Sequence, residues 1–264
     1  VIKNFQGLAI DSRVVKKNNL FLTIKGKNND GSKFIPHALN KGARYIVSSK
    51  VEKRYRNKTL KVKNEILFLN KFAKLKRENS LAKIIAITGS AGKTSLKNLI
   101  KQLLQNFAKT HSSPKSYNNH LGVPISLSNL SVEDKYGIFE IGMSKKGEID
   151  NLSKLIKPHI GIITNIGEAH IENFSNIHGI AKAKSEIINS IEKNGTIILN
   201  RDDKFFNFLR KKAKLKKLKI ITFGKNKKSD IFPLIFLKSS YSTRVIFKVK
   251  KEKINLEFKI LWLL

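Results

Sequence analysis

The chain has 264 residues, 41% of them hydrophobic, which is enough for one large domain or two ordinary domains with hydrophobic cores. It contains no cysteine, which excludes a disulfide framework, a thiolate metal site and a thiol nucleophile. No apolar run approaches the length of a membrane span, and the first residues lack the pattern of an export signal. We therefore expect a cytoplasmic protein without a membrane span.

The formal net charge of +34 would ordinarily indicate a partner such as nucleic acid or an anionic membrane. The excess, however, is mostly lysine, is spread along the whole chain, and accompanies abundant Asn, Ile and Phe, as an AT-rich coding sequence would produce. We interpret the densest run, Arg210 to Lys219, as the solvated face of a helix and the linker after it. We expect no nucleic-acid partner, whereas a positive surface would favour small polyanionic substrates such as nucleotides.

Residues 1–79 are predicted to form a small α/β domain. Its predicted elements are strands at Leu8 to Ile10, Leu20 to Ile24 and Tyr45 to Val47, a short helix at Phe34 to Gly42 and an amphipathic helix over 65–79. The boundary is expected at Asn79-Ser80. Within this domain Asp11-Ser12-Arg13 follows a strand, and by themselves these residues are typical of a turn and a helix cap.

Residues 80–264 alternate predicted strands and helices. The strands are Tyr136 to Ile141, Ile160 to Thr164, Thr196 to Leu199 and Lys219 to Phe223, and the helices are Glu148 to Ile156 and Ile177 to Ile191. Such alternation predicts a mainly parallel sheet covered by helices, with ligands at the carboxyl ends of the strands. From Ile231 the pattern becomes β-rich, with strands at Arg244 to Val249 and Ile254 to Ile260, which predicts a small terminal β-sheet.

The stretch from Ile84 to Leu96, IIAITGSAGKTSL, predicts a strand, a glycine loop and a helix in direct succession. This order builds a phosphate cradle, because backbone N–H groups and the positive end of the helix converge on an anion. The strict G-x-x-x-x-G-K-[ST] pattern fails, since Ile87 stands where its first glycine would be, and the shorter T-G-S-x-G-K-T pattern fits. Lys93 would reach the terminal phosphates and the Thr94 hydroxyl would hold Mg²⁺.

Polar residues follow four predicted strands at their carboxyl ends. They are Glu140; Thr164-Asn165 with Gly167, Glu168 and His170; Lys184 and Glu186 on the helix after these; and Asn200, Asp202 and Asp203. Mg²⁺ takes oxygen ligands beside phosphates, and Glu140 suits that role. Individually, Lys184 is more typical of a solvated helix residue and Asn200 of a turn, and His170 is equally a cap or a core residue. Together they predict a site where the phosphate loop opens.

At this point the chain resembles the Mur ligases, over nearly its whole length. The resemblance rests on five segments, ITGSAGKTS at 87–95, NNHLGVPISL at 118–127, EIGMSKKGEI at 140–149, ITNIGEAHIENF at 163–174 and IAKAKSEI at 180–187, and on DSRVVKKNNLFLTIKGKNNDG at 11–31. Within the family, 118–124 and 140–149 are similar to the member that adds D-alanyl-D-alanine. The resemblance implies a UDP-substrate-binding domain followed by a P-loop ATPase-type domain.

The resemblance also implies roles for individual residues, with ATP and Mg²⁺ as cofactors. The loop Gly89, Ser90, Ala91, Gly92, Lys93, Thr94 and Ser95 would bind the ATP phosphates, and Asn200 would lie near the adenine. Thr94 and Glu140 would hold one Mg²⁺, and His170 would hold a second together with Lys184, carried as a carbamate. Ser12 and Arg13 would bind the uridine diphosphate, while Asn118 and Asn119 would face the substrate. Lys93, His170 and Lys184 would be the catalytic residues.

The implied reaction activates the terminal carboxylate of UDP-N-acetylmuramoyl tripeptide as an acyl phosphate, which the amine of D-alanyl-D-alanine attacks. Ser32 and Phe174-Ser175-Asn176 depart from the family pattern, which affects local loop contacts. Val1 is no initiator methionine, and the chain stops in the apolar run Ile260 to Leu264, so we expect a fragment without the family's C-terminal Rossmann-like domain, monomeric and nearly inactive alone. Two alternatives stay open: a sibling ligase that adds a diamino acid or glutamate, and a non-catalytic nucleotide-binding remnant.

Overall fold

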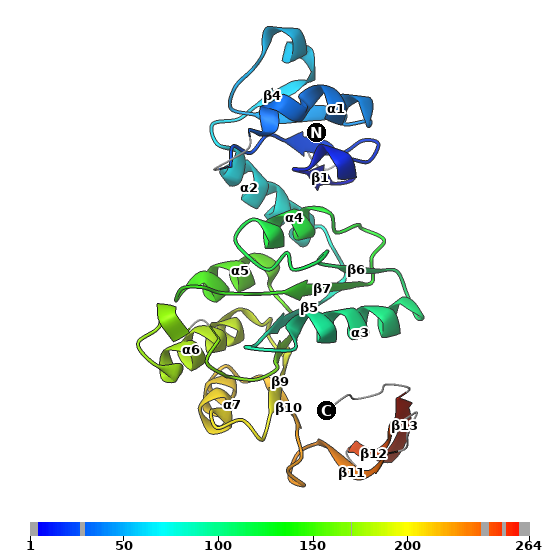
Figure 1. Cartoon of the computed structure of the whole chain (residues 1–264), viewed down its shortest axis with the longest axis vertical. Helices are drawn as coiled ribbons and strands as arrows, with labels where there is room; N and C mark the ends of the chain where they lie inside the picture. The colour runs from blue at the N-terminus through cyan, green and yellow to red at the C-terminus, as the bar shows by residue number, and fades with distance from the viewer. Residues whose placement is uncertain (1–4, 27–29, 170, 239–242, 250–251, 259–264) are drawn as a thin grey trace.

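The computed structural model describes residues 5–26, 30–169, 171–238, 243–249 and 252–258. Figure 1 shows an elongated molecule, with the N-terminal unit at one end, the helix α2 leading from it into a larger unit, and the strands β11 to β13 at the other end. The predicted α/β class is confirmed. Val1 and the run Ile260 to Leu264 lie outside the described residues.

The N-terminal unit has a four-stranded parallel sheet of order β1-β2-β3-β4. Its elements are β1 (Leu8–Ala9), β2 (Leu20–Leu22), β3 (Tyr45–Ser48), β4 (Thr59–Lys61), α1 (Ile35–Asn40) and α2 (Glu65–Glu78). Of these, β4 was not predicted. The α2 helix begins as its sequence indicates, because the Asn64 side chain accepts a hydrogen bond of 2.9 Å from the Leu67 N–H.

The larger unit is built on a sheet of order β13-β12-β11-β10-β9-β8-β5-β7-β6. Its strands are β5 (Lys83–Thr88), β6 (Thr110–Ser112), β7 (Tyr136–Glu140), β8 (Ile160–Ile163), β9 (Thr196–Asn200), β10 (Lys219–Phe223), β11 (Ile231–Lys238), β12 (Thr243–Val249) and β13 (Glu252–Phe258). The strands β5 to β10 are parallel, as predicted. The strands β11 to β13 are antiparallel to one another and form the predicted small sheet, which the single pair Phe223 and Ile231 joins to β10.

The helices of this unit are α3 (Lys93–Gln105), α4 (Gly122–Ser128), α5 (Glu148–Ile156), α6 (Ile177–Lys184) and α7 (Phe206–Leu215). The helix predicted over Ile177 to Ile191 is α-helical only to Lys184, and 185–190 form a tighter 3-10 turn. The Ser185 hydroxyl donates 2.6 Å to the carbonyl of Lys182, a local bond that competes with regular helix bonding.

The connections of the sheet reverse direction once, after β6. From β5 the chain crosses to β6 at the edge, and every later parallel crossover moves the opposite way, through β7, β8, β9 and β10. Because such crossovers are right-handed, the reversal puts α3 on one face of the sheet and α4 to α7 on the other. The buried residues agree, since Ile87, Ile138 and Ile162 pack with α3, while Ile84, Phe139 and Ile163 belong to the larger core. A ligand site is expected at this switch point.

The two units share a buried contact. Leu8, Leu22 and Phe72 of the first unit pack together with Ile125 of α4. The Asn129 side chain, just after α4, accepts from the Leu8 N–H at 3.2 Å and donates to its carbonyl at 2.8 Å. This two-way bond to a strand backbone fixes the edge of β1 against the second unit.

Candidate nucleotide-binding site

The loop between β5 and α3 has the backbone that its glycines allow. Gly89 has a φ of +151° and Gly92 a φ of +80°, both in the region that favours glycine. A Cβ at Gly89 would stand 1.8 Å from Oγ1 of Thr164 at the end of β8, whereas one at Gly92 would meet no atom within 4 Å. Gly89 is therefore required because the ends of two strands approach closely there. At Gly92 the space beside the backbone is free of other protein atoms.

The loop is held from the side of β8. The Asn165 carbonyl accepts from the Ser90 N–H at 3.0 Å, and its side-chain Oδ1 accepts from the Ala91 N–H at 2.9 Å. The Ser90 hydroxyl donates to the Gly167 carbonyl at 3.0 Å and accepts from the Gly167 N–H at 2.8 Å. The side chain of Ser90 and the amide of Ala91 thus have protein partners, so they shape the loop in this conformation.

The first turn of α3 keeps its donors free. Within the described residues, the N–H groups of residues 92–95, from Gly92 to Ser95, donate no hydrogen bond to protein. Free N–H groups at a helix start carry the positive end of the helix dipole and bind anions. The Lys93 ammonium lies over the loop and donates 2.8 Å to the Gly89 carbonyl. Burial lowers the pKa of Lys93, and the charge of Glu140 opposes that shift.

Glu140 is the acidic group of this site, and it is almost completely buried at the end of β7. Its Oε2 accepts from the Thr94 hydroxyl at 2.8 Å, and its Oε1 accepts from the Asn118 side chain at 2.8 Å. Three of the predicted site residues, Thr94, Asn118 and Glu140, are therefore in direct contact. Asn118, which the sequence predicts to face the substrate, thus also binds the acidic group of the site.

The oxygen donors of this site fit Mg²⁺. A hydroxyl and a carboxylate meet beside the free amides of the loop, and Mg²⁺ prefers one or two such ligands together with phosphate oxygens and waters. Among the described residues, no group of three or more His, Cys, Asp or Glu side chains could hold a metal by itself. The hydroxyl and the carboxylate thus suit a cation that arrives with a phosphate.

Lys184 lies at the last position of α6 and is 3% exposed. Burial, and secondly the nearby charge of Lys93, lower the pKa of Lys184 to about 7. A substantial fraction of this side chain is therefore a neutral amine near neutral pH, unlike the side chain of a solvated helix lysine. His170, its predicted partner on a second Mg²⁺, lies outside the described residues.

The other polar residues predicted at this edge accept hydrogen bonds from backbone N–H groups, some nearby and some distant in sequence. Asn200 ends β9, and its Oδ1 accepts from the Asp202 N–H at 2.9 Å. Asp203 accepts from the N–H groups of Ile166 at 2.6 Å and Phe205 at 2.8 Å. Glu186 likewise accepts from the Gly147 N–H at the start of α5. Asn200 stands two strands from β5, a separation of about 9.5 Å at ordinary strand spacing.

The predicted uridine diphosphate residues lie on the other unit, in a 3-10 turn at Ser12–Val14. Ser12 is buried and its Oγ is 2.8 Å from Nδ1 of His37, a histidine on α1 that the sequence analysis did not identify. Arg13 is exposed and forms an ion pair of 2.7 Å with Asp11, which holds the pKa of that carboxyl below its usual range. Asn119, by contrast, caps α4, since its Oδ1 accepts from the Gly122 N–H at 2.8 Å.

Lys97 was missed by the sequence analysis. It is 1% exposed, and its Nζ lies 3.7 Å from Oε2 of Glu140. Its spacing could have indicated this position, because residues three apart on a helix share a face and Lys97 is three residues after Thr94. On the same helix, the apolar residues Leu99 and Leu103 are exposed.

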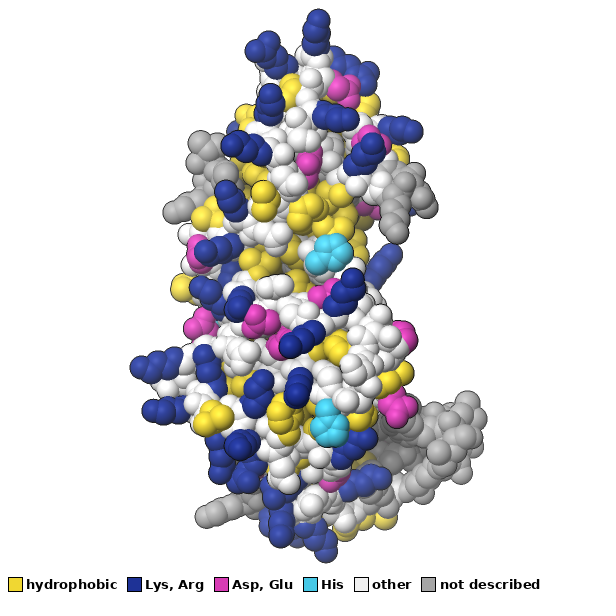
Figure 2. All heavy atoms as spheres, turned by 90° about the vertical axis from the view of Figure 1, so that its left-hand side faces the viewer, with side chains coloured by type: hydrophobic (Ala, Val, Ile, Leu, Met, Phe, Trp, Pro, Cys, Tyr) yellow, Lys and Arg dark blue, Asp and Glu magenta, His cyan; other side chains and the backbone are white. Residues whose placement is uncertain are grey.

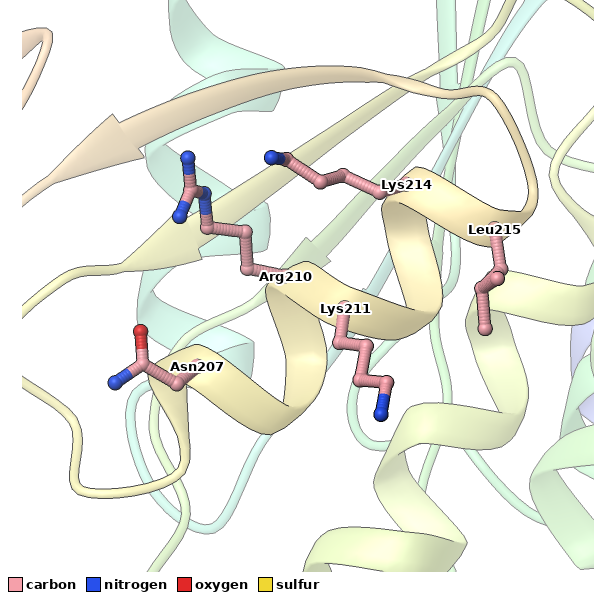
Figure 3. Close-up of a pocket in the computed structure, with 5 residues that line it drawn as sticks. All are labelled: Asn207, Arg210, Lys211, Lys214 and Leu215. Atoms are coloured by element: carbon pink, nitrogen blue, oxygen red, sulfur yellow. The ribbon is translucent and has the colours of Figure 1, made fainter.

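The basic run near the end of the chain lies elsewhere. Three of its residues, Arg210, Lys211 and Lys214, border a hollow of about 390 Å³ over α7 together with Asn207 and Leu215. Figure 3 shows that all five stand on α7 and that Lys211 points away from Arg210 and Lys214. Figure 2 shows Lys and Arg side chains distributed over the whole visible face of the molecule. Among the described residues, no helix is long and apolar enough to cross a membrane.

Fold and site together define a P-loop protein with a mainly parallel sheet. Residues 87–261 match the family model of the Mur ligase middle domain, and residues 4–77 match the model described as Mur ligase family, catalytic domain. The chain belongs to the Mur ligase family.

Known relatives agree with this assignment. The chain is 38% identical over 259 residues to UDP-N-acetylmuramoyl-tripeptide--D-alanyl-D-alanine ligase of Rickettsia prowazekii, a match that covers 97% of this chain and 55% of the relative. A crystal structure of MurF from Acinetobacter baumannii has a TM-score of 0.83 at 30% identity and covers 96% of this chain and 55% of that one. MurF of Thermotoga maritima, solved in complex with ADP, has a TM-score of 0.81 at 26% identity, over 97% of this chain and 59% of that one. The chain thus spans about half the length of the relatives it matches.

Proposed function

We propose that this chain is part of an ATP-dependent amide ligase that joins D-alanyl-D-alanine to UDP-N-acetylmuramoyl tripeptide in peptidoglycan precursor synthesis. The observation that carries the proposal is the contact of the Thr94 hydroxyl with Glu140 beside the free amides of residues 92–95. The proposal is supported by the relatives that are named UDP-N-acetylmuramoyl-tripeptide--D-alanyl-D-alanine ligase, among them the one from Rickettsia prowazekii. Residues 1–79 would bind the uridine diphosphate substrate and residues 80–264 the ATP. We place the protein in the cytoplasm as a monomer.

In this proposal ATP and Mg²⁺ supply a phosphoryl group and a charge that stabilises its transfer. The amides of residues 92–95 would bind the phosphates, and the Lys93 ammonium would move from the Gly89 carbonyl to the phosphate oxygens. Thr94 and Glu140 would hold the cation. Because all these groups are already positioned, they would stabilise charge at the transferring group without large rearrangement. Activation is needed because an oxygen of a free carboxylate is a very poor leaving group.

Lys184 would act with His170 on a second Mg²⁺, after carbamylation. A neutral amine is required to attack CO₂, forming the N–C bond and releasing one proton, and the product is a carboxylate-like oxygen ligand. The burial of Lys184, which lowers the pKa of its amine, supports this role. Ser12 and Arg13 of the first unit would bind the uridine diphosphate, and Asn118 and Asn119 would face the substrate. Asn200 would lie near the adenine.

The test is the dependence of ADP binding on Mg²⁺, followed by substrate-dependent ADP formation. We expect the chain to bind ADP more tightly with Mg²⁺ present, as measured by isothermal titration calorimetry. In the full-length product of its gene, ADP formation from ATP and UDP-N-acetylmuramoyl tripeptide should require D-alanyl-D-alanine. Stimulation of ADP formation by a diamino acid or glutamate instead would assign the protein to a sibling ligase. If Mg²⁺ does not affect nucleotide binding, the proposal is overturned.

A further inference from the structure

Lys97 is a buried ammonium for which the proposed reaction has no use. It lies on α3, and its Nζ is 3.7 Å from Oε2 of Glu140. The same Nζ donates a hydrogen bond to the backbone carbonyl of Lys115. A buried cation is costly unless it is paired and hydrogen-bonded, and Lys97 meets both conditions with these two partners.

The carbonyl that Lys97 holds belongs to the segment 113–121, which connects β6 to α4 and contains no regular helix or strand. Lys115 itself has a φ of +47°, a conformation that a side-chain-bearing residue adopts only when its surroundings impose it. Further along, the Asn118 side chain reaches Oε1 of Glu140, and the Asn118 carbonyl accepts from the Gly142 N–H at 2.8 Å. The segment is thus attached to the Glu140 carboxylate directly through Asn118 and indirectly through Lys97, and the Ser113 hydroxyl accepts from the Glu140 N–H at 3.3 Å.

Glu140 consequently joins three parts of the molecule. Thr94 contacts it from the phosphate loop, Asn118 from the connecting segment, and Lys97 binds both the carboxylate and the segment. If this carboxylate moves, or if a cation binds it, its contacts with Asn118 and Lys97 change. Both contacts would pass that change on to the segment 113–121.

We propose that Lys97 is a positioning residue that couples the carboxylate of the nucleotide site to the connecting segment 113–121. It orients Glu140 for a cation and keeps the segment, with Asn118 and Asn119, in the conformation seen here. The inference deepens the proposed function and rests on it for the identity of the cation and nucleotide. The coupling itself is a property of the free protein.

The experiment compares Lys97→Met, Lys97→Arg and Lys101→Met. Met retains the apolar stem of Lys97 and removes the charge, whereas Arg retains charge and donors. Lys101 is the matched control, because it lies one turn further on α3 and makes no ion pair among the described residues. Amide hydrogen exchange of residues 115–121 is measured without ligand, and ADP affinity is measured against Mg²⁺ concentration.

We expect K97M to accelerate exchange of residues 115–121 about tenfold, as the loss of one charge-assisted contact implies, and to shift the Mg²⁺ concentration for half-maximal effect, because the Lys97 ammonium both orients Glu140 and repels a cation beside it. K97R should recover part of both changes, and K101M should show neither. A purely structural lysine would lower the melting temperature of K97M without a segment-specific change in exchange, and that result would overturn the inference.

A second measurement, on the unsubstituted chain, tests the coupling even if K97M does not fold. In the unsubstituted chain, Mg²⁺ and ADP together should slow exchange of residues 115–121 more than ADP alone does. If ADP and Mg²⁺ bind and exchange in this segment does not respond, the coupling is wrong while the proposed function stands. If neither binds, the proposed function fails, and the ligand-free comparison of K97R with K101M still decides the coupling.

Discussion

The Thr94 hydroxyl donates a hydrogen bond of 2.8 Å to Oε2 of Glu140, so the phosphate loop and the end of β7 meet through one short contact. Thr94 comes from α3 and Glu140 from a strand 46 residues further along the chain. The contact exists because β5 and β7 are neighbours and their carboxyl ends point to the same edge. It brings the two oxygen donors together before any cation binds.

The first prediction concerns the charge of Glu140. Glu140→Gln keeps the shape of the side chain and one acceptor oxygen, but it removes the anion that would hold Mg²⁺. We expect the stimulation of ADP binding by Mg²⁺ to fall about tenfold or more, with ADP binding in chelator nearly unchanged. Titration calorimetry measures both, and the exposed Glu133→Gln is the matched control. Unaltered Mg²⁺ dependence in E140Q would exclude Glu140 as a ligand.

The second prediction concerns Gly89. Gly89→Ala places a Cβ 1.8 Å from Oγ1 of Thr164 and requires a φ of +151°. We expect a loss of at least about 1–3 kcal/mol in the free energy of unfolding, because both the clash and the backbone strain oppose the native loop. Urea denaturation measures the loss. Gly92→Ala is the comparison, since its Cβ meets no atom within 4 Å and only the strain at a φ of +80° applies. Equal losses in the two variants would contradict the close approach of Gly89 to Thr164.

The third prediction is a pH dependence from Lys184. Its pKa is lowered from 10.5 to about 7 by burial, so above pH 7 the unfolded chain binds more protons than the native one. The native state therefore gains stability from this group as the pH rises from about 7 toward 10.5, and the cost of burial is fully present below pH 7. We expect Lys184→Met to stabilise the chain most at pH 6 to 7, by up to a few kcal/mol, and progressively less toward pH 10.

Denaturation of wild type and K184M at several pH values, in buffer free of CO₂, tests this directly. The exposed Lys211→Met, whose side chain stands on α7, is the control and should show no such trend. A stability difference between wild type and K184M that does not vary with pH would mean that Lys184 is not the buried amine described here.

The fourth prediction concerns Arg77, near the end of the helix that connects the two units. Its guanidinium donates to the carbonyl of Ile156 at 2.6 Å and to that of Lys157 at 2.8 Å, at the C-terminus of α5. Arg77→Met would leave these carbonyls without that donor, and we expect a loss of about 1–3 kcal/mol in the free energy of unfolding. The exposed Lys74→Met, on the same helix, should cost much less. Similar losses in both variants would show that Arg77 acts only through helix propensity.

Much of the fold was predictable because it depends on local patterns. The apolar run of β5 and the glycine loop before α3 are contiguous in sequence, so their order determines strand, loop and helix. The helix Glu148–Ile156 has the predicted bounds, since its apolar period and its flanking residues agree. The predicted extent of α6 was wrong, because a hydrogen bond of the Ser185 side chain competes with regular helix bonding at its end. The spacing of apolar residues does not indicate such a bond.

What the sequence by itself determined was the presence of a phosphate loop, a parallel sheet and the residue types that a nucleotide and Mg²⁺ require. Only the tertiary structure decided which of them meet. Lys97 and Asn118 reach Glu140, whereas Asn119 caps α4 and Ser12 binds His37. The physical reason is that strand order and crossover direction bring distant segments together. Spacing along a single chain indicates which residues share a helix face or a strand end, but not which of these faces and ends come into contact.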